Sequence, residues 1–518
     1  MKAKQPFTLT PSGMFAQPAA LQAQARFQQA WALHQGGQLP QALQLYEQVI
    51  QAQPRHFDAL HLAGVISLQL GHADKAVDLI TRALKIDRDS VSALNNRGAA
   101  YMELRQYDLA LLNYNKAISL DPKAPKSYNN RGNTLGKLNR LEEALQDFDK
   151  AIELDPSYFS AYNNRATVLS DLLRYDEARA SLKKAIELNP ESVDAHWNLG
   201  MLLLRLGEFE QGWLESEWRL KRPQALGLKD SYAAPMWTGA EPLTGKTVLV
   251  CSEQGLGDTI QFCRYAPLLA GMGARVVFEV QPALMDLLRH LPSVELIAQG
   301  SEPPAYDLYC PLMSLPMLLK TDLGNMPPPP DVIRVEPAQL AHWQGLLGEK
   351  RKPRVGLVWS GNASHVDDYK RSIPNASHVD DYKRSIPLQT FVSILDDDIE
   401  WISLHKDVRA SDQAVLRAHP AIRHFGAEQK VFTDAAAICE GLDVVIAVDT
   451  SLAHLAATMG KPTWMLLARS ADWRWLQARQ DNPWYPSLKL YRQSTPGNWV
   501  DVLQAVRADL KQLFGQPV

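Results

Sequence analysis

The sequence is poor in features that would assign the chain to several specialised classes of protein. Its 518 residues contain four cysteines, none in a C-x-x-C pair: Cys251, Cys263, Cys310 and Cys439. Scattered cysteines within apolar patterns argue against a disulfide framework and against a cysteine-bound metal. Opposite charges nearly cancel, with 54 Lys and Arg against 57 Asp and Glu. No bulk charge therefore favours nucleic acid or an anionic membrane as a partner.

Long hydrophobic runs and common nucleotide-binding motifs are also missing. No apolar run reaches the roughly 20 residues of a membrane span. The N-terminal stretch MKAKQPFTLTPSGMFAQPAA has no continuous apolar core for a signal peptide. We therefore expect a cytoplasmic protein with no membrane span. The absence of G-x-G-x-x-G and of G-x-x-x-x-G-K-[ST] removes the main support for dinucleotide redox chemistry and for a P-loop enzyme.

The N-terminal half instead carries a 34-residue repeat. Small residues recur in one phase at Ala30, Gly64, Gly98, Gly132, Ala166 and Gly200, and the units close on Pro54, Pro122, Pro156 and Pro190, with Arg88 as the one replacement. This pattern resembles tetratricopeptide repeats, in which small residues let two antiparallel helices approach and proline ends the second helix. We predict an α-solenoid with a concave groove over residues 23–222, after a flexible N-terminus at 1–22. Five full repeats and a degenerate sixth fill this range.

The sixth repeat, at about 193–222, departs from the pattern. Gly212 replaces the expected alanine, and Trp213 and Trp218 follow. Because exposed tryptophans would be costly on a terminal repeat, we expect this segment to join the next domain. The alternative is a simple capping helix.

Asparagine recurs at one repeat position, at Asn96, Asn130, Asn164 and Asn198. A ladder of side-chain amides offers donors and acceptors to the backbone of an extended protein segment or peptide. This ladder resembles the one lining the superhelix of eukaryotic O-GlcNAc transferases, where it is associated with binding of protein substrates. The alternative is that asparagine is ordinary filler at this position.

The C-terminal half reads as two successive β/α series. The first has strands at 246–251 and 275–280 and a helix from Thr259 to about Gly271, and the second begins at 354–359. The proline tract 326–330 marks a loop or boundary between them. We predict twin Rossmann-like lobes facing a cleft, at 223–335 and 336–518, with a closing C-terminal helix near 499–514.

The strongest site signal lies in the stretch 444–467, VVIAVDTSLAHLAATMGKPTWMLL. It predicts a strand, a tight turn, a short helix and a second strand. Asp449, Thr450, Ser451 and His454 would lie at the carboxyl end of the first strand, where helix N–H groups favour phosphates. The alternative is that Asp449 or Thr450 caps the helix and that His454 is packed in the core.

A second signal is an unusual duplication. The segment 362–374, NASHVDDYKRSIP, is repeated without change at 375–387. Positive charge is needed to balance a departing diphosphate, so Lys370 and Arg371 compete with Lys383 and Arg384 for one role. We favour Lys383 and Arg384, because the second copy adjoins the next helix, while Asn362 stays beside the preceding strand. The alternative is that the extra copy obstructs the cleft.

The turn Gly255-Leu256-Gly257-Asp258 ends the first strand of lobe one. Two glycines let a substrate approach the backbone, and we place Gly257 on the donor side. The Asp258 carboxylate is suited to take the proton of an acceptor hydroxyl as a general base. The alternative is that Asp258 caps the following helix.

These motifs carry a family resemblance. The strand–GLGD–helix start, V-D-T-S-L-A-H and D-W-R-W-L resemble the GT-B glycosyltransferases of family 9, typified by lipopolysaccharide heptosyltransferases. The whole arrangement resembles bacterial tetratricopeptide glycosyltransferases. The resemblance implies an inverting, single-displacement transfer with Asp258 as base, and a nucleotide-diphosphate contact at 449–454. It implies no metal and no cofactor beyond the nucleotide-sugar substrate.

Two further features are weaker. We interpret Asp396, Asp397 and Asp398 as a solvated turn rather than a D-x-D metal site, and the run Trp473, Trp475, Trp484 and Tyr485 as either pocket lining or packing between lobes. The sequence thus favours a glycosyltransferase whose repeats recruit a protein or saccharide acceptor. A non-catalytic adaptor with a degenerate transferase domain is the alternative, and a nucleotide-sugar epimerase is a third class.

Overall fold

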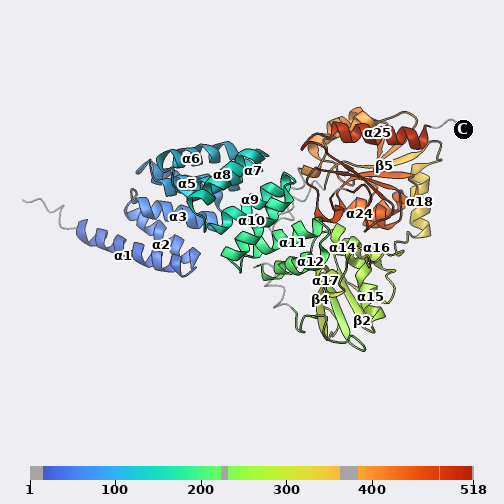
Figure 1. Cartoon of the computed structure of the whole chain (residues 1–518), viewed down its shortest axis with the longest axis horizontal. Coiled ribbons are helices and arrows are strands. Elements are labelled where there is room, and N and C mark those ends of the chain that lie inside the picture. Colours follow the sequence, from blue (N-terminus) through green and yellow to red (C-terminus); the bar gives the residue numbers. More distant parts are fainter. Residues whose placement is uncertain (1–15, 223–231, 362–382, 478, 516–518) are drawn as a thin grey trace, which may run out of the picture. The chain divides into compact units, whose positions relative to one another are not determined.

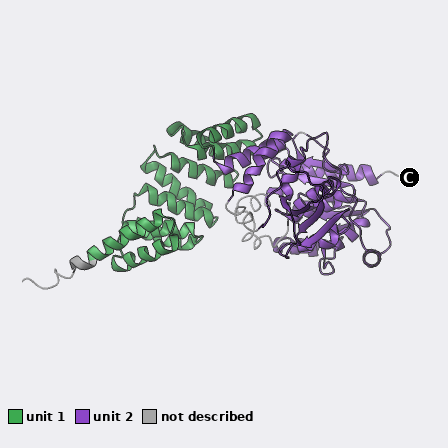
Figure 2. Cartoon of the chain, turned by 90° about the horizontal axis from the view of Figure 1, so that it is seen from below, with its two compact units in different colours: residues 1–190 green, residues 191–518 purple. Residues whose placement is uncertain are grey.

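The computed structural model describes residues 16–222, 232–361, 383–477 and 479–515 (Figure 1). The chain divides into two compact units, residues 1–190 and 191–518 (Figure 2). The duplicated segment lies mostly outside the described residues, as do Asn362, Lys370 and Arg371.

The first unit is a stack of antiparallel helix pairs. Its helices are α1 (Ala16–Gln35), α2 (Leu39–Ala52), α3 (Phe57–Gln69), α4 (Ala73–Leu84), α5 (Val91–Glu103), α6 (Tyr107–Leu120), α7 (Pro125–Lys137), α8 (Leu141–Leu154), α9 (Phe159–Asp171) and α10 (Tyr175–Leu188). The repeated small residues lie where the helices of a pair touch. A Cβ on Gly98 would come 2.5 Å from Cε1 of Tyr114, and one on Gly132 would come 2.8 Å from Cε1 of Phe148. The aromatic ring fills the space that glycine leaves open.

Helix α1 begins at Ala16, which corrects the expectation of a flexible segment reaching residue 22. The extra residues, AQPAALQ, are mostly Ala, Leu and Gln, which are good helix formers.

The second unit begins with the sixth repeat, formed by α11 (Val193–Arg205), α12 (Phe209–Ser216) and the 3₁₀ turn η2 (Glu217–Lys221). Trp213 is buried at the joint, as predicted: its indole N–H donates to the Thr321 carbonyl (2.9 Å), and its ring meets Trp473 edge-on. Trp218 has a different role, because it stacks on His196 within the repeat, with ring centroids 3.7 Å apart.

Lobe one is built on a parallel sheet in the order β3-β2-β1-β4. Its elements are β1 (Thr247–Cys251), α14 (Leu256–Phe262), η3 (Cys263–Tyr265), α15 (Ala266–Gly271), β2 (Arg275–Val280), η4 (Pro282–Leu284), α16 (Met285–Leu288), β3 (Val294–Ala298), β4 (Leu308–Pro311), η5 (Leu312–Ser314) and α17 (Leu315–Leu318). The single helix expected over 259–271 is divided by η3. Pro267 lacks the N–H that would continue an α-helical ladder, so the break falls just before it.

Lobe two has a parallel sheet in the order β10-β9-β8-β5-β6-β7. Its elements are α18 (Pro337–Leu347), β5 (Arg354–Val358), α21 (Leu388–Phe391), η6 (Val392–Ile394), β6 (Glu400–Ser403), α22 (Ala410–Ala418), β7 (Ile422–His424), α23 (Phe432–Glu440), β8 (Val444–Val448), α24 (Ser451–Thr458), β9 (Thr463–Leu467), η7 (Trp473–Trp475), β10 (Leu488–Arg492) and α25 (Val500–Phe514). The predicted strand–turn–helix–strand unit at 444–467 is confirmed. The proline tract 326–330 is irregular backbone, also as predicted.

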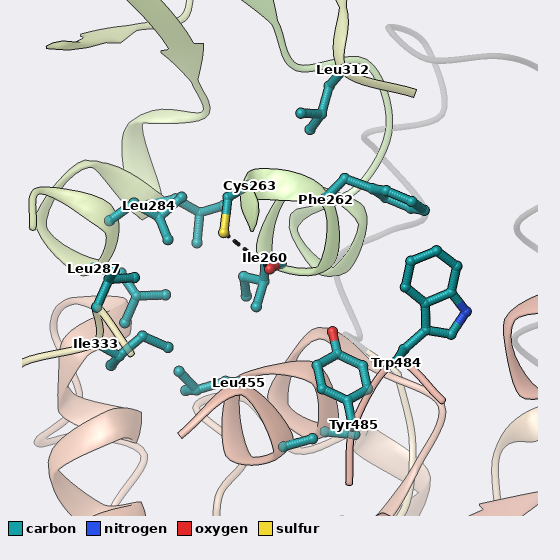
Figure 3. Close-up of a cluster of buried hydrophobic side chains, with 14 of the residues drawn as sticks. Ile260, Phe262, Cys263, Leu284, Leu287, Leu312, Ile333, Leu455, Trp484 and Tyr485 are labelled. Atoms are coloured by element: carbon teal, nitrogen blue, oxygen red, sulfur yellow. Dashed lines mark hydrogen bonds between the residues drawn. The ribbon is translucent and has the colours of Figure 1, made fainter. Parts of the chain in front are cut away.

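One apolar core extends from lobe one into lobe two (Figure 3). Ile260 and Phe262 of α14 belong to it, together with Leu455 of α24 and the side chains of Trp484 and Tyr485. The two lobes therefore share a packed interface, and the candidate site lies at its polar edge.

Candidate functional site

The candidate residues follow strands that flank a change of direction in each sheet. In lobe two, β5 and β8 are neighbours, and the strand order runs outward from them in opposite directions. Residues after β5 lead to Arg384, and β8 ends directly before Asp449. Ligands of open α/β sheets bind outside the carboxyl ends of strands at such a switch point. In lobe one, β1 ends before the Gly255–Asp258 turn and lies between β2 and β4.

The starts of α14 and α24 come together across the lobe interface. A Cβ on Gly257 would lie 2.9 Å from Cδ2 of His454 and 3.5 Å from Cα of Ser451. Any larger residue at 257 would push the two helices apart. The structure thus brings together two motifs that are almost 200 residues apart in the sequence.

Asp258 stands in the first turn of α14, since the helix begins at Leu256 rather than at Thr259. Its Oδ2 accepts from the Gly255 N–H (2.8 Å), and its Oδ1 accepts from the Arg474 guanidinium. Burial raises the pKa of Asp258, and Asp472 adds to this, whereas the Arg474 cation opposes it. Asp258 therefore accepts from the N-cap backbone as the third residue of the helix, rather than standing before the helix as the cap considered for it. Its catalytic role stays a prediction.

Beside the same contact, the buried His454 lies next to the half-buried Asp449. Asp449 Oδ2 accepts from the Trp475 indole (2.7 Å), and Nε2 of His454 lies 3.8 Å from Asp449 Oδ1. Nδ1 of His454 lies 2.9 Å from the Tyr485 hydroxyl. Burial lowers the pKa of His454 to about 3, helped by the Arg474 cation, so the imidazole is neutral near pH 7. Burial raises the pKa of Asp449, and Asp472 reinforces that shift.

Thr450 and Ser451 begin α24, with Thr450 at the N-cap position in extended backbone. The Thr450 hydroxyl does not cap the helix, and in the described part of the chain its buried oxygen has no hydrogen-bond partner. An unpaired buried hydroxyl is costly, so it invites a polar ligand or a water. The capping role considered for Thr450 is absent from the structure.

Within the described part of the duplicated segment, the charge of Arg384 acts on the site residues. Its positive charge lowers the pKa of Asp449 against the larger effect of burial, and it lowers the pKa of His454. Both Arg384 and the adjacent Lys383 are half-buried. A cation beside the start of α24 is what the predicted diphosphate role of Arg384 requires.

Arg474 lies in the D-W-R-W-L motif but is not among the site residues that the sequence predicts. It is buried between Asp258 and Asp472, and its Nη1 donates to Asp472 Oδ1 at 2.8 Å. Its guanidinium also lies over the Trp473 ring, 4.6 Å from the centroid. An arginine between two tryptophans was the available signal, because such cations stack on aromatic faces.

The asparagine ladder is engaged within the repeats. The Asn96 amide nitrogen lies 2.9 Å from Nε2 of His61, and Asn164 donates to Oδ1 of Asn129 in the preceding repeat (3.0 Å). Asn130 lies beside Asn129 and accepts weakly from its amide (3.5 Å). Asn198 belongs to α11 in the second unit. The amides therefore link neighbouring repeats, and peptide binding stays a prediction.

The remaining expectations concern packing. The run Trp473, Trp475, Trp484 and Tyr485 is buried in the core shared by the lobes, which favours the packing interpretation. Asp396–Asp398 form a turn in which Asp396 accepts from the Asp398 N–H (3.0 Å). Within the described ranges, no helix is long and apolar enough to cross a bilayer.

Comparison with known proteins gives matches over the repeats. Family models described as tetratricopeptide repeat match residues 33–96, 91–124, 125–158 and 148–180, and a model described as TPR repeat matches 174–207. Protein FlbA of Caulobacter vibrioides is 24% identical over 332 residues, covering 60% of this chain and 54% of that protein. The chain thus spans about half the length of this curated relative.

Several solved structures are similar to part of this chain. MamA protein is 20% identical, with a TM-score of 0.29, covering 33% of this chain and 92% of that one. PilF of Pseudomonas aeruginosa is 19% identical, with a TM-score of 0.34, and the match covers 42% of this chain and 100% of that one. A tetratricopeptide repeat protein from Parabacteroides merdae is 21% identical, with a TM-score of 0.34, covering 38% and 78%. The helix pairs and the matching family models together identify the N-terminal part of the chain, to about residue 210, as an array of tetratricopeptide repeats, which supports a role in protein interaction.

Proposed function

We propose that this protein is a metal-independent, inverting GT-B glycosyltransferase whose repeats recruit the acceptor. The observation that carries the proposal is the meeting of α14 and α24 at Gly257 and His454. It joins the carboxyl ends of β1 and β8, so residues from both lobes surround one point. Twin-lobed transferases place donor and acceptor at such a point.

The donor side is lobe two. The free N–H groups at the start of α24 and the hydroxyls of Thr450 and Ser451 suit a nucleotide diphosphate. Arg384, with Lys383 beside it, supplies positive charge to the leaving group. His454 is neutral, so it serves as a hydrogen-bonding group rather than a cation.

The acceptor side is lobe one, with Asp258 as general base. Asp258 takes the proton of an acceptor hydroxyl, the acceptor oxygen bonds to the anomeric carbon, and the sugar–phosphate bond breaks with its electron pair leaving on the diphosphate. Burial favours this role, because a raised pKa makes the carboxylate a stronger base. Arg474 must loosen its contact with Asp258 when the acceptor enters.

Acceptor recruitment falls to the repeats. A protein segment lying along Asn96, Asn130 and Asn164 would exchange inter-repeat amide contacts for contacts to its own backbone. This makes recruitment largely independent of the sequence of the segment.

Two substitutions test the proposal and control for each other. Thr450→Val removes an unpaired hydroxyl at constant shape, so the free protein keeps its stability while donor affinity falls about tenfold, or about 1.4 kcal/mol. Asp258→Asn leaves donor binding intact and abolishes transfer. Calorimetry with ADP-, UDP- and GDP-sugars measures binding, and radiolabelled sugar incorporation measures transfer. Retained turnover in Asp258→Asn would remove Asp258 as the base.

The second candidate is a non-catalytic adaptor, and one observation favours it. Arg474 already donates to Asp258, and the neighbouring Trp475 donates to Asp449, as in a network that holds the lobes together without binding a substrate. An adaptor predicts no saturable binding of any of the three nucleotide sugars. It also predicts that Thr450→Val changes nothing.

A further inference from the structure

A basic hollow lies between the second and third repeats, away from the candidate site in the lobes. It has a volume of about 210 Å³ and is lined by Lys85 and Arg88 after α4, Arg97 of α5 and Lys116 of α6, with Thr81 at its wall. Small-molecule pockets usually measure about 300–1,000 Å³. This hollow is therefore sized for a single side chain rather than for a nucleotide.

The local chain path creates the hollow. Helix α4 ends at Leu84, two residues before the position at which the equivalent helices α2, α6, α8 and α10 end. Arg88 stands in the following turn, where the other repeats have proline. The shortened helix leaves space, and the arginine adds a charge that the repeat pattern does not need.

Arg97 differs from the arginines at its repeat position. Arg131 binds Asp147 through Nε (2.7 Å) and Nη2 (2.6 Å), and Arg165 binds Asp149 (2.7 Å). In the part of the chain that the structure describes, Arg97 instead donates to two neutral partners, Asn113 at 2.9 Å and Thr81 at 3.2 Å.

Arg97 differs in its partners because the repeat positions that hold the acids elsewhere carry other residues here. Thr81 stands where the later repeat has Asp149, and Lys85 where it has Glu153. Among the described residues, the side chains of Lys85 and Arg88 have no ion pair. Lys116 does pair with an acid, Asp89, at 3.1 Å, but the Asp89 side chain is 70% exposed.

We propose that this hollow is an anion-binding site that takes a carboxylate side chain from an acidic segment of a partner protein. Arg97 presents a half-buried guanidinium fork to the carboxylate, and Lys85, Arg88 and Lys116 attract it from the rim. Proteins are the expected partners because the repeats support protein interaction, and because the hollow is too small for a nucleotide. This site does not depend on the proposed transferase activity.

The experiment uses the full chain and a labelled, end-blocked hexaglutamate peptide, with hexaglutamine as the uncharged comparison. Fluorescence anisotropy should show saturable hexaglutamate binding that weakens with salt. Asn113→Asp places in this repeat the carboxylate that Arg131 has in the next, so it should weaken binding about tenfold. The same variant should raise the thermal midpoint, which shows that the loss is not caused by misfolding.

Two further variants sharpen the test. Arg88→Pro restores the residue of the other repeats and should weaken binding to a smaller extent. Arg131→Gln, at the same repeat position as Arg97 but outside the hollow, should leave binding unchanged. The proposal is overturned if hexaglutamate does not saturate, if Asn113→Asp binds as wild type, or if Arg131→Gln weakens binding equally. An oligouridine that binds more tightly and responds to Asn113→Asp would assign the site to nucleic acid instead.

Discussion

The two compact units make similar ion pairs over very different distances in the sequence. In the repeats, Arg131 reaches Asp147, 16 residues away on the partner helix of its own pair. In the lobes, Arg474 reaches Asp258, 216 residues away, and so joins the two sheets. A local pair supports one repeat, whereas the long-range pair supports an interface on which both lobes depend.

The difference predicts how much of the structure is destabilised when an ion pair is lost. Each repeat contacts mainly its neighbours, so a lost pair is felt locally. The unfolding of the two units can be followed by different signals, because only Trp31 of the 13 tryptophans lies before residue 191. Tryptophan fluorescence therefore reports on the second unit, and far-ultraviolet circular dichroism weights the helical repeats.

The largest expected effect follows from removing Arg474. Arg474→Met removes a buried cation and leaves the partly buried carboxylates of Asp258 and Asp472 without it. Losing one partner of a fully buried pair costs about 3–5 kcal/mol, which sets the upper bound of the loss here. Denaturant unfolding followed by tryptophan fluorescence should show this loss in the second unit. The matched variant Arg131→Met strands one buried carboxylate and should cost about 1–3 kcal/mol, visible by dichroism with little fluorescence change. Equal losses in both signals for both variants would contradict the comparison.

Acid should weaken the second unit through His405 and His454. Burial lowers the pKa of each to about 3, against about 6.5 when unfolded. Below pH 6.5 the unfolded chain binds more protons, so stability is complete above that pH and falls toward pH 3 by up to about 1.4 kcal/mol per pH unit for each histidine. The raised pKa values of Asp258 and Asp449 act in the opposite direction.

A His454→Gln variant isolates one of these contributions. Its free energy of unfolding should fall less steeply between pH 7 and pH 5. The difference in slope should approach that of one bound proton, about 1.4 kcal/mol per pH unit. Denaturant unfolding of the wild type and of the variant at several pH values measures this difference. The contributions of Asp258 and Asp449 are common to both proteins and cancel in the comparison. An unchanged slope would mean that His454 is not held neutral by burial.

Close glycine contacts should give smaller losses in both units. Gly98→Ala and Gly257→Ala introduce a Cβ 2.5 Å from Tyr114 and 2.9 Å from His454. Overpacking costs about 1–3 kcal/mol, and the better helix propensity of alanine returns up to about 1 kcal/mol. Gly136→Ala is the control, because its nearest atom is 3.7 Å away, and it should stabilise the repeats. Thermal midpoints measure all three, and a destabilised control would show that backbone effects dominate.

The sequence was sufficient where structure depends on local pattern. The 34-residue period predicted the helix pairs, and the apolar runs at 444–448 and 463–467 predicted β8 and β9. The break at η3 was not predicted, because one amphipathic pattern covers both sides of it. The early end of α4 was not predicted either, since a hydrophobic pattern marks the faces of a helix better than its ends.

The candidate site was predictable only as separate motifs. Asp258 and His454 were selected from their positions after strands, and the structure places their helices in contact. Arg474 was missed, because no local signal tells which carboxylate an arginine 216 residues away will bind. The same limit applies to Arg97. That it has neutral partners where Arg131 and Arg165 have acids is visible only when the repeats are compared with one another.

The smallest expected effect comes from an exposed pair in the repeats, which separates bond geometry from burial. Arg140 binds Glu143 through two contacts of 2.7 Å, nearly the distances of the Arg131–Asp147 pair. Both side chains of this pair are about half exposed, however, so water screens the attraction and solvates either partner left alone. Arg140→Ala should leave the thermal midpoint by circular dichroism unchanged, at low salt and at high salt. A loss as large as that of Arg131→Met would show that pair geometry, rather than burial, determines how much an ion pair stabilises this array.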